Sequence, residues 1–217
     1  MRRDVRWVGL SPEERREARR ALLVEAGFDL LGTEGASGTT VRAVCAAAEL
    51  NARYFYESFD DIDALLVAVY DHVAAGLAAA FADIQVPDDI DPVKGARLGM
   101  EAIVNFIDED RRRARVLYVE ALGNEALARH RLEVDREAVL SLEARAIEAA
   151  GSWPQGERVG QVGAAMLVGG ISEVLRDWVE GRIVVTRDQL IDDLAVFAIA
   201  LATATDQIAR RRAAKRK

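Results

Sequence analysis

The sequence has one cysteine and two histidines among its 217 residues. Cys45, a lone thiol in an alanine-rich segment, cannot form a disulfide within the chain, and its setting favours a small buried side chain over a redox sensor. His72 and His130 lie far apart, and neither has a second histidine or a cysteine at the spacing of a metal site. A glycine loop of the phosphate-binding kind is also missing, because the glycine pair at 169–170 lies inside a helical pattern. We therefore predict no metal, no cofactor and no enzymatic activity.

Strand signals and long apolar runs are scarce as well. The one β-branched run, at residues 183–186, is short and lies between two helical patterns. Residues 1–10 are charged and lack the apolar core of a signal peptide, and no stretch reaches the roughly 20 uninterrupted apolar residues of a membrane span. With 51% apolar and only 6% aromatic residues, the composition favours an all-α, cytoplasmic protein.

A strongly basic balance is missing too, because the formal net charge is −7. DNA-binding proteins usually carry a basic surface, so the distribution of charge matters more than the sum. Residues 1–60 are nearly balanced, residues 210–217 are basic, and the acidic excess lies between them. Arg2, Arg3 and Arg6, in an arm over residues 1–10, either reach DNA or form a solvated start. The basic tail at 209–217 is interpreted as a solvated helix end.

What the sequence does contain is a helix-turn-helix pattern at residues 40–59. Two threonines precede a short helix with an apolar face at Val41, Val44 and Cys45. A polar interruption at 49–51 follows, and Asn51 can cap a second short helix. In that helix Phe55 and Phe59 lie four residues apart and can pack together against the first helix. The remaining side chains of the second helix are then expected to face outward.

The segment around this pattern resembles the N-terminal domain of the TetR family of one-component transcriptional regulators, over roughly residues 17–77. The most specific part is the aromatic run YFY at 54–56, followed by Phe59, an acidic cap and the motif ALL at 64–66. One position departs from the family, since Ile62 occupies a place where a lysine or arginine usually contacts a phosphate. The resemblance implies a DNA-binding regulator, with repression the commoner mode.

We assign the contacts with DNA to residues at the start of each short helix. Thr40 and Arg42 are suited to phosphates, and the guanidinium of Arg53 can pair with the edge of a guanine. Tyr54 and Tyr56 can reach phosphate oxygens or thymine methyl groups, although Tyr56 can instead pack in the domain core. The predicted DNA-binding set is Thr40, Arg42, Asn51, Ala52, Arg53, Tyr54 and Tyr56.

The chain is predicted to form about nine helices in two domains. Residues 11–84 hold a three-helix DNA-binding domain together with a connecting helix from Ile62 to about Ile84. Its first helix opens with a capping box at Ser11 and runs to about Leu31, where Gly32 and Gly35 are expected to end it. A linker rich in acidic residues and proline leads to a second, larger domain at 91–208. Its helices are expected near 92–107, 110–121, 125–150, 155–180 and 187–208, with breaks at 108–110, 123–124, 151–154 and Gly181. Thr186 and Gln189 form a second capping box before the last helix.

The last two of these helices carry apolar and glycine positions spaced three and four apart. Glycine costs helical stability, so its clustering on one face suggests that helices approach closely there. Two such helices from each of two chains would form a four-helix dimer interface, although the glycines can also pack within one subunit. The resemblance likewise implies a homodimer. The predicted interface residues are Gly163, Leu167, Gly170, Val174, Leu190, Leu194, Phe197 and Leu201.

The resemblance also implies a small-molecule effector enclosed by the second domain, of a largely apolar kind. Residues that can line such a cavity, or else simply form the core, are Met100, Val104, Phe106, Ile107, Tyr118, Met166 and Trp178. The favoured function is therefore a repressor that a ligand releases from a palindromic, double-stranded operator. The alternative is an all-helical interaction module or adaptor whose helix-turn-helix contacts protein instead of DNA.

Overall fold

The computed structural model describes residues 9, 11–84, 90–150 and 158–215, with the backbone alone at 143–150. Every regular element in these ranges is helical, so the all-α prediction is confirmed. The N-terminal part comprises α1 (Pro12–Glu34), α2 (Val41–Ala47), α3 (Ala52–Tyr56) and the connecting α4 (Ile62–Ala82). The larger second part comprises α5 (Pro92–Glu109), α6 (Arg111–Ala114), the π-helical η2 (Arg115–Glu120), α7 (Ala121–Gly123), α8 (Glu125–Ala150), α9 (Val159–Val179) and α10 (Arg187–Ala214).

The predicted helix starts are confirmed by their caps. The Ser11 hydroxyl accepts from the Glu14 amide at 3.2 Å, and the Glu14 carboxylate accepts from the Ser11 amide at 2.6 Å. Thr186 and Gln189 form the second capping box at the start of α10. Both arrangements satisfy amides that a helix leaves unpaired at its first turn. Short-range polar patterns were therefore sufficient to locate these helix starts.

Several helix ends differ from the prediction. α1 passes through Gly32, where an end was expected, and stops at Gly35, which has a φ of 78°. α10 runs to Ala214, so the arginines at 210–212 are helical. The predicted helix at 110–121 is divided into α6, η2 and α7. The arm at 1–8, the linker at 85–89, the break at 151–157 and residues 216–217 lie outside the described residues.

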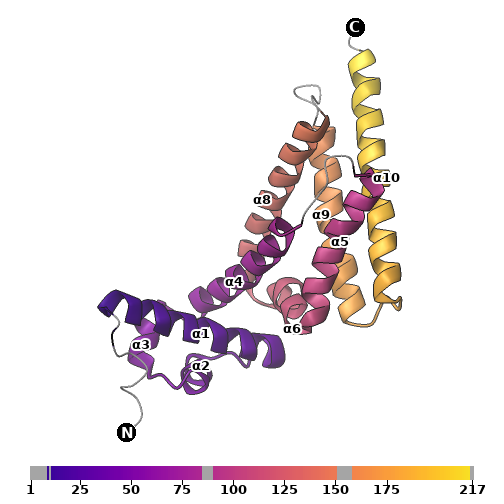
Figure 1. Cartoon of the computed structure of the whole chain (residues 1–217). Helices are drawn as coiled ribbons and strands as arrows, with labels where there is room; N and C mark the ends of the chain where they lie inside the picture. Colours follow the sequence, from indigo (N-terminus) through magenta and orange to yellow (C-terminus); the bar gives the residue numbers. More distant parts are fainter. Residues whose placement is uncertain (1–8, 10, 85–89, 151–157, 216–217) are drawn as a thin grey trace.

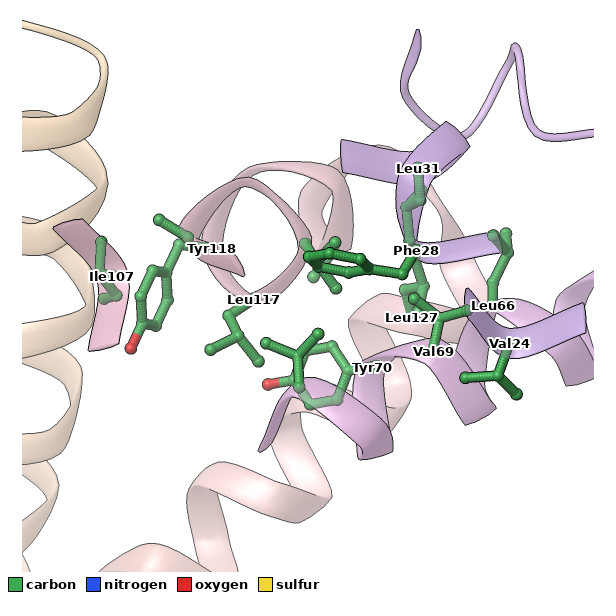
Figure 2. Close-up of a cluster of buried hydrophobic side chains, with 14 of the residues drawn as sticks. Val24, Phe28, Leu31, Leu66, Val69, Tyr70, Ile107, Leu117, Tyr118 and Leu127 are labelled. Carbon is green, nitrogen blue, oxygen red and sulfur yellow. The ribbon is translucent and has the colours of Figure 1, made fainter. Parts of the chain in front are cut away.

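α4 connects the two parts through a continuous core. Its buried residues include Leu65, Leu66, Val69 and Tyr70, and the helix contacts α1, α5 and α8. Figure 2 shows Val24, Phe28 and Leu31 of α1 on one side of this core and residues of the second domain on the other. The two domains therefore share packed side chains and not only a linker.

α4 is also long and apolar enough to cross a membrane by length and composition, with a mean hydropathy of 1.7. Such a pattern is equally typical of a core helix, and this helix packs on α1, α5 and α8. Figure 1 shows α1 to α3 below the bundle of α5, α8, α9 and α10, with α4 running from the one group into the other. This arrangement separates the helix-turn-helix from most of the second domain.

Candidate nucleic-acid interface

The turn between α2 and α3 is tight and slightly strained. Glu49 has a φ of 54°, which is unusual for a residue other than glycine. The backbone around it is fixed by a hydrogen bond from the Leu50 amide to the Cys45 carbonyl at 2.9 Å. This turn sets α3 at an angle to α2, as a helix-turn-helix requires.

Both short helices are capped by side chains within the predicted set. The Thr40 hydroxyl accepts from the Ala43 amide at 3.2 Å, and the Asn51 carbonyl oxygen accepts from the Tyr54 amide at 3.2 Å. Thr39, the other threonine before α2, is buried and donates its hydroxyl to the Gly35 carbonyl at 2.8 Å. These bonds fix helices that are too short to be stable by themselves.

α3 has a buried aromatic side and an exposed polar side. Phe55 is fully buried, and its ring centroid lies 5.7 Å from that of Phe59, so the predicted pairing is confirmed. Tyr56 is 61% exposed, so it does not pack in the domain core, which was the alternative. Arg53 is 84% exposed along its side chain. The helix therefore presents a basic and an aromatic side chain to solvent.

The predicted DNA-binding residues share the surface of α2 and α3. All of them are exposed except Tyr54, which is half-buried because the guanidinium of Arg19 lies 4.5 Å from its ring centroid. Ile62, at the position where the family usually has a basic residue, is half-buried and packs against the core. This side chain therefore fills space inside the domain, and no phosphate contact is assigned to it.

Arginines of α1 form part of this region and were missed from the sequence. Arg19 contacts Tyr54 and Glu57, and the guanidinium of Arg20 lies 4.9 Å from the Phe59 ring centroid. The signal was present as the run RREARR at residues 15–20, but α1 was interpreted only as a core helix. The helix-turn-helix has few positive charges of its own, and this arginine-rich segment of α1 adds more beside it.

Two arginines after α5 attach the second domain to the C-terminal end of α1. The Arg112 guanidinium donates to Asp29 at 2.6 Å and lies 4.8 Å from the Phe28 ring centroid. Asp110 also accepts from Arg112, at 2.7 Å, and this pairing lowers the pKa of Asp110. Arg115 donates to the Thr33 carbonyl at 2.6 Å. Carbonyls at the end of a helix lack partners within it, so Arg115 supplies one from another domain.

Glu120 completes this attachment, which we call the α1 clasp (Arg112, Arg115 and Glu120). Its carboxylate accepts from the Ala36 amide at 2.8 Å and from Arg115 at 2.8 Å. The Glu120 side chain is only 13% exposed, so both bonds are largely shielded from water. No sequence motif had indicated the contact with α1, because Glu120 and Ala36 are 84 positions apart.

The predicted cavity residues fall into two groups. Met100, Val104, Ile107, Tyr118 and Trp178 are buried, and Phe106 is half-buried. Met166, in contrast, is 60% exposed on α9, so its assignment to an internal cavity was wrong.

Tyr70 and Tyr118 place hydroxyl groups in this core. Figure 2 shows Tyr70 of α4 and Tyr118 of η2 on either side of Leu117. Burial is the main cause that raises the pKa of both hydroxyls, so both stay protonated at neutral pH. Tyr70 had not been selected from the sequence, since on α4 it had no polar neighbours to mark it.

A cleft of about 450 Å³ lies between α1, α4, α5 and α6, at the junction of the two domains. Phe28 and Val73 are among its apolar lining residues, and Glu25, Arg112 and Arg113 are among the charged ones. Of the predicted cavity residues, only Phe106 lines it. The cleft is thus mostly distinct from the apolar interior that the sequence had suggested.

The predicted dimer residues are also divided by the structure. Leu190 and Leu194 are buried within the subunit, and a Cβ at Gly163 would lie 2.5 Å from the Thr205 hydroxyl oxygen. These three positions therefore serve packing inside one chain. Leu167, Val174 and Leu201 are half-buried, Gly170 is exposed, and Phe197 is 69% exposed.

Other apolar side chains extend this exposed surface of α9 and α10. Val162, Met166 and Val196 are each more than half exposed, and a Cβ at Gly169 or Gly170 would have no neighbour within 4 Å. An exposed apolar surface of this kind is unusual on a monomer.

His130 and Cys45, of the types that often support catalysis or metal binding, make ordinary structural contacts. His130 is bonded to Asp71, and its ring lies 5.6 Å from that of Tyr70. Cys45 is buried, which raises the pKa of its thiol. Within the described ranges, no group of three or more histidine, cysteine, aspartate or glutamate side chains could hold a metal ion.

The comparisons with known proteins agree with this arrangement. Residues 23–69 match the model of the bacterial regulatory proteins of the tetR family. No curated protein is significantly similar in sequence. A solved TetR-family transcriptional regulator from Syntrophomonas wolfei is 15% identical with a TM-score of 0.70, over 86% of this chain and 96% of that one.

Two further solved structures have the same fold. A TetR-like transcriptional regulator from Rhodococcus sp. RHA1 is 21% identical with a TM-score of 0.60, over 84% of this chain and 96% of that one. FadR from Bacillus subtilis, in complex with stearoyl-CoA, is 14% identical with a TM-score of 0.66, over 82% of this chain and 96% of that one. Residues 23–69 are therefore similar to the tetR family of bacterial regulatory proteins, and the chain has the fold of the solved TetR-family transcriptional regulators.

Proposed function

We propose that this protein is a cytoplasmic, sequence-specific DNA-binding regulator, a repressor that a small molecule releases from its operator. The observation that carries the proposal is the two-sided character of α3. Phe55 anchors the helix in the core, while Arg53 and Tyr56 are exposed. A helix that is fixed from behind and exposes an arginine can enter the major groove and contact base edges.

The other residues of the predicted set have supporting roles. Thr40 and Arg42 lie at the start of α2, where exposed hydroxyl and guanidinium groups can bind phosphates. Asn51 and Ala52 begin α3, so they are close to the part of a recognition helix that approaches DNA first. Tyr54 stacks with Arg19, which favours a role in orienting the helix.

The protein acts as a homodimer in this proposal. The exposed apolar surface of α9 and α10 supports it, with Phe197 and Gly170 from the predicted set and Val162, Met166 and Val196 beside them. A two-fold dimer places two copies of α3 in successive major grooves, about 34 Å apart or a multiple of that. The operator is therefore an inverted repeat.

A largely apolar ligand in the second domain provides the input. The solved FadR structure of the same fold contains stearoyl-CoA. The interior of the second domain, where it packs on α4, is built from apolar residues, with the hydroxyls of Tyr70 and Tyr118 among them. The α1 clasp connects that interior with the DNA-binding domain, since η2 carries both Tyr118 and Glu120. To change DNA occupancy from nearly complete to nearly absent, the ligand must favour the released state by about 5.5 kcal/mol.

Selection of bound sequences from random duplex DNA tests this function. We expect an enriched palindromic sequence whose affinity falls steeply as salt is added, because bound counterions are released from the phosphates. The alternative function, a protein-interaction module, predicts that no sequence is enriched. Titration of the enriched duplex at several salt concentrations completes the test, since binding that does not depend on salt would contradict phosphate recognition.

A further inference from the structure

The carboxylate of Glu57 lies between two guanidinium groups at the end of α3. One oxygen, Oε1, accepts from Nε of Arg53 at 3.1 Å, and the other, Oε2, accepts from Nη2 of Arg19 at 3.4 Å. The Glu57 side chain is 35% exposed, so the ion pairs are only partly open to solvent. One carboxylate therefore links Arg53, the arginine of α3, to a residue of α1.

Arg19, the inner member of this chain of contacts, is itself fixed. Its side chain is 15% exposed, and its guanidinium lies 4.5 Å from the ring centroid of Tyr54. Tyr54 lies in α3, whose start is held by the bond from the Tyr54 amide to Asn51. Glu57 is therefore supported from behind by groups that have little freedom to move.

Arg53, the outer member, uses only one of its guanidinium nitrogens in this contact. Its Nε is bonded to Glu57, whereas Nη1 and Nη2 have no partner among the described residues. The two Nη groups of an arginine can donate together to O6 and N7 of guanine. A long side chain normally loses rotamer freedom when it binds, and the bond at Nε removes part of that freedom beforehand.

We infer that Glu57 is a positioning residue which directs the two Nη groups of Arg53 toward one guanine in each half of the DNA site. The inference rests on the proposed function, because it needs a DNA target. It adds a determinant of specificity outside the predicted DNA-binding set, and it assigns the chemistry of one base pair as G·C. A carboxylate that carried no such role would be a helical i, i+4 ion pair with a small effect on stability alone.

The test compares Glu57→Ala with Asp60→Ala in the full chain. Both changes remove one carboxylate near α3, but Asp60 is exposed and has no contact with Arg53 among the described residues. Each variant is subjected to selection from random duplex DNA, followed by titration of duplexes that differ at single positions. We expect Glu57→Ala to reduce the preference for G·C at one position of each half-site by about tenfold. This is within the discrimination between base pairs that a bidentate arginine contact provides. Asp60→Ala retains the preference.

Two further variants show whether Glu57 acts through Arg53. Glu57→Gln keeps an acceptor oxygen for Arg53 without the charge. We therefore expect it to retain part of the preference for G·C that Glu57→Ala loses. In an Arg53→Ala background, Glu57→Ala should change nothing further at that position, because the side chain that it orients is absent. Thermal unfolding of each variant verifies that the fold is intact, and Glu57→Gln serves as the test if Glu57→Ala does not fold.

The outcomes separate the inference from the proposed function. If the unmodified protein enriches no sequence, the proposed function is wrong. If it enriches a sequence and Glu57→Ala keeps the same base preferences as Asp60→Ala, Glu57 is not a positioning residue. An equal change at all positions, or a change that persists without Arg53, would likewise overturn the inference, since both would mean that Glu57 only supports the helix.

Discussion

Gly32 shows how a residue far away in the sequence can require glycine at one position of a helix. Glycine inside a helix costs about 1 kcal/mol relative to alanine, so the sequence had suggested that α1 ends there. In the structure a Cβ at Gly32 would lie 2.6 Å from the Cβ of Arg112, closer than real Cβ atoms approach. The missing side chain lets the α1 clasp lie against the helix.

We therefore predict that Gly32→Ala destabilises the protein in spite of its better helix propensity. The overpacking costs about 1 to 3 kcal/mol, which exceeds the gain in propensity. Urea unfolding measures the change. Gly95→Ala is the matched control, because its Cβ would meet only Ile90 at an ordinary 3.6 Å. A Gly32→Ala protein as stable as the Gly95→Ala protein would show that Arg112 moves aside at little cost.

At this scale the sequence predicted the local contacts well. Ser11, Asn51 and Thr186 were selected as caps because each cap bonds to a residue only three positions away. Arg112 and Glu120 were not selected, because their partners in the N-terminal part, Asp29 and Ala36, lie far along the chain and no local spacing encodes them. Met166 was placed inside the domain since apolar character alone does not say which side of a helix is covered.

Among the elements, η2 departs most from the expected pattern. Val116, Leu117 and Tyr118 are consecutive and all buried. A π-helical turn is wider than an α-helical one and pairs residues five positions apart. The sequence predicted one regular helix at 110–121, because only the breaks at its two ends were marked by local residues. The π-helical stretch also brings Arg115 and Glu120 together at 2.8 Å.

The contribution of the α1 clasp can be measured with Glu120→Ala. This change leaves the Ala36 amide and Arg115 without their shielded acceptor, which costs about 1 to 3 kcal/mol. Amide hydrogen exchange at residues 35–39 should become faster, because the loop after α1 loses its link to the second domain.

The matched control for the clasp is Glu109→Ala. Glu109 pairs with Arg113 at 3.1 Å, but its side chain is 70% exposed, so its loss should cost less than about 0.5 kcal/mol. Equal stability of the two variants would mean that the bonds of Glu120 to Ala36 and Arg115 contribute little to the contact between the domains.

At the scale of the whole molecule, α10 has one side that packs within the chain and another that is exposed. Leu190 and Leu194 pack inward, and α10 contacts α5 and α9, while Phe197 and Val196 on the same helix are exposed. The spacing of apolar residues identified this helix correctly, but it could not tell the side that packs within the chain from the side left open. That distinction depends on where α5 lies, which no periodicity in α10 reveals.

The exposed side of α10 leads to a prediction about assembly. Phe197→Asp introduces a charge on the apolar surface of α9 and α10, and a charge that is buried without a partner is strongly unfavourable. We expect this variant to sediment as a monomer and to lose affinity for a complete inverted repeat, because the second copy of α3 is no longer tethered beside the first. Leu132→Asp is the control, since Leu132 is 68% exposed, close to the 69% of Phe197, but lies on α8. A Phe197→Asp protein that stays dimeric would place the dimer interface elsewhere. A protein that becomes monomeric yet binds the full repeat as before would show instead that one α3 is sufficient for recognition.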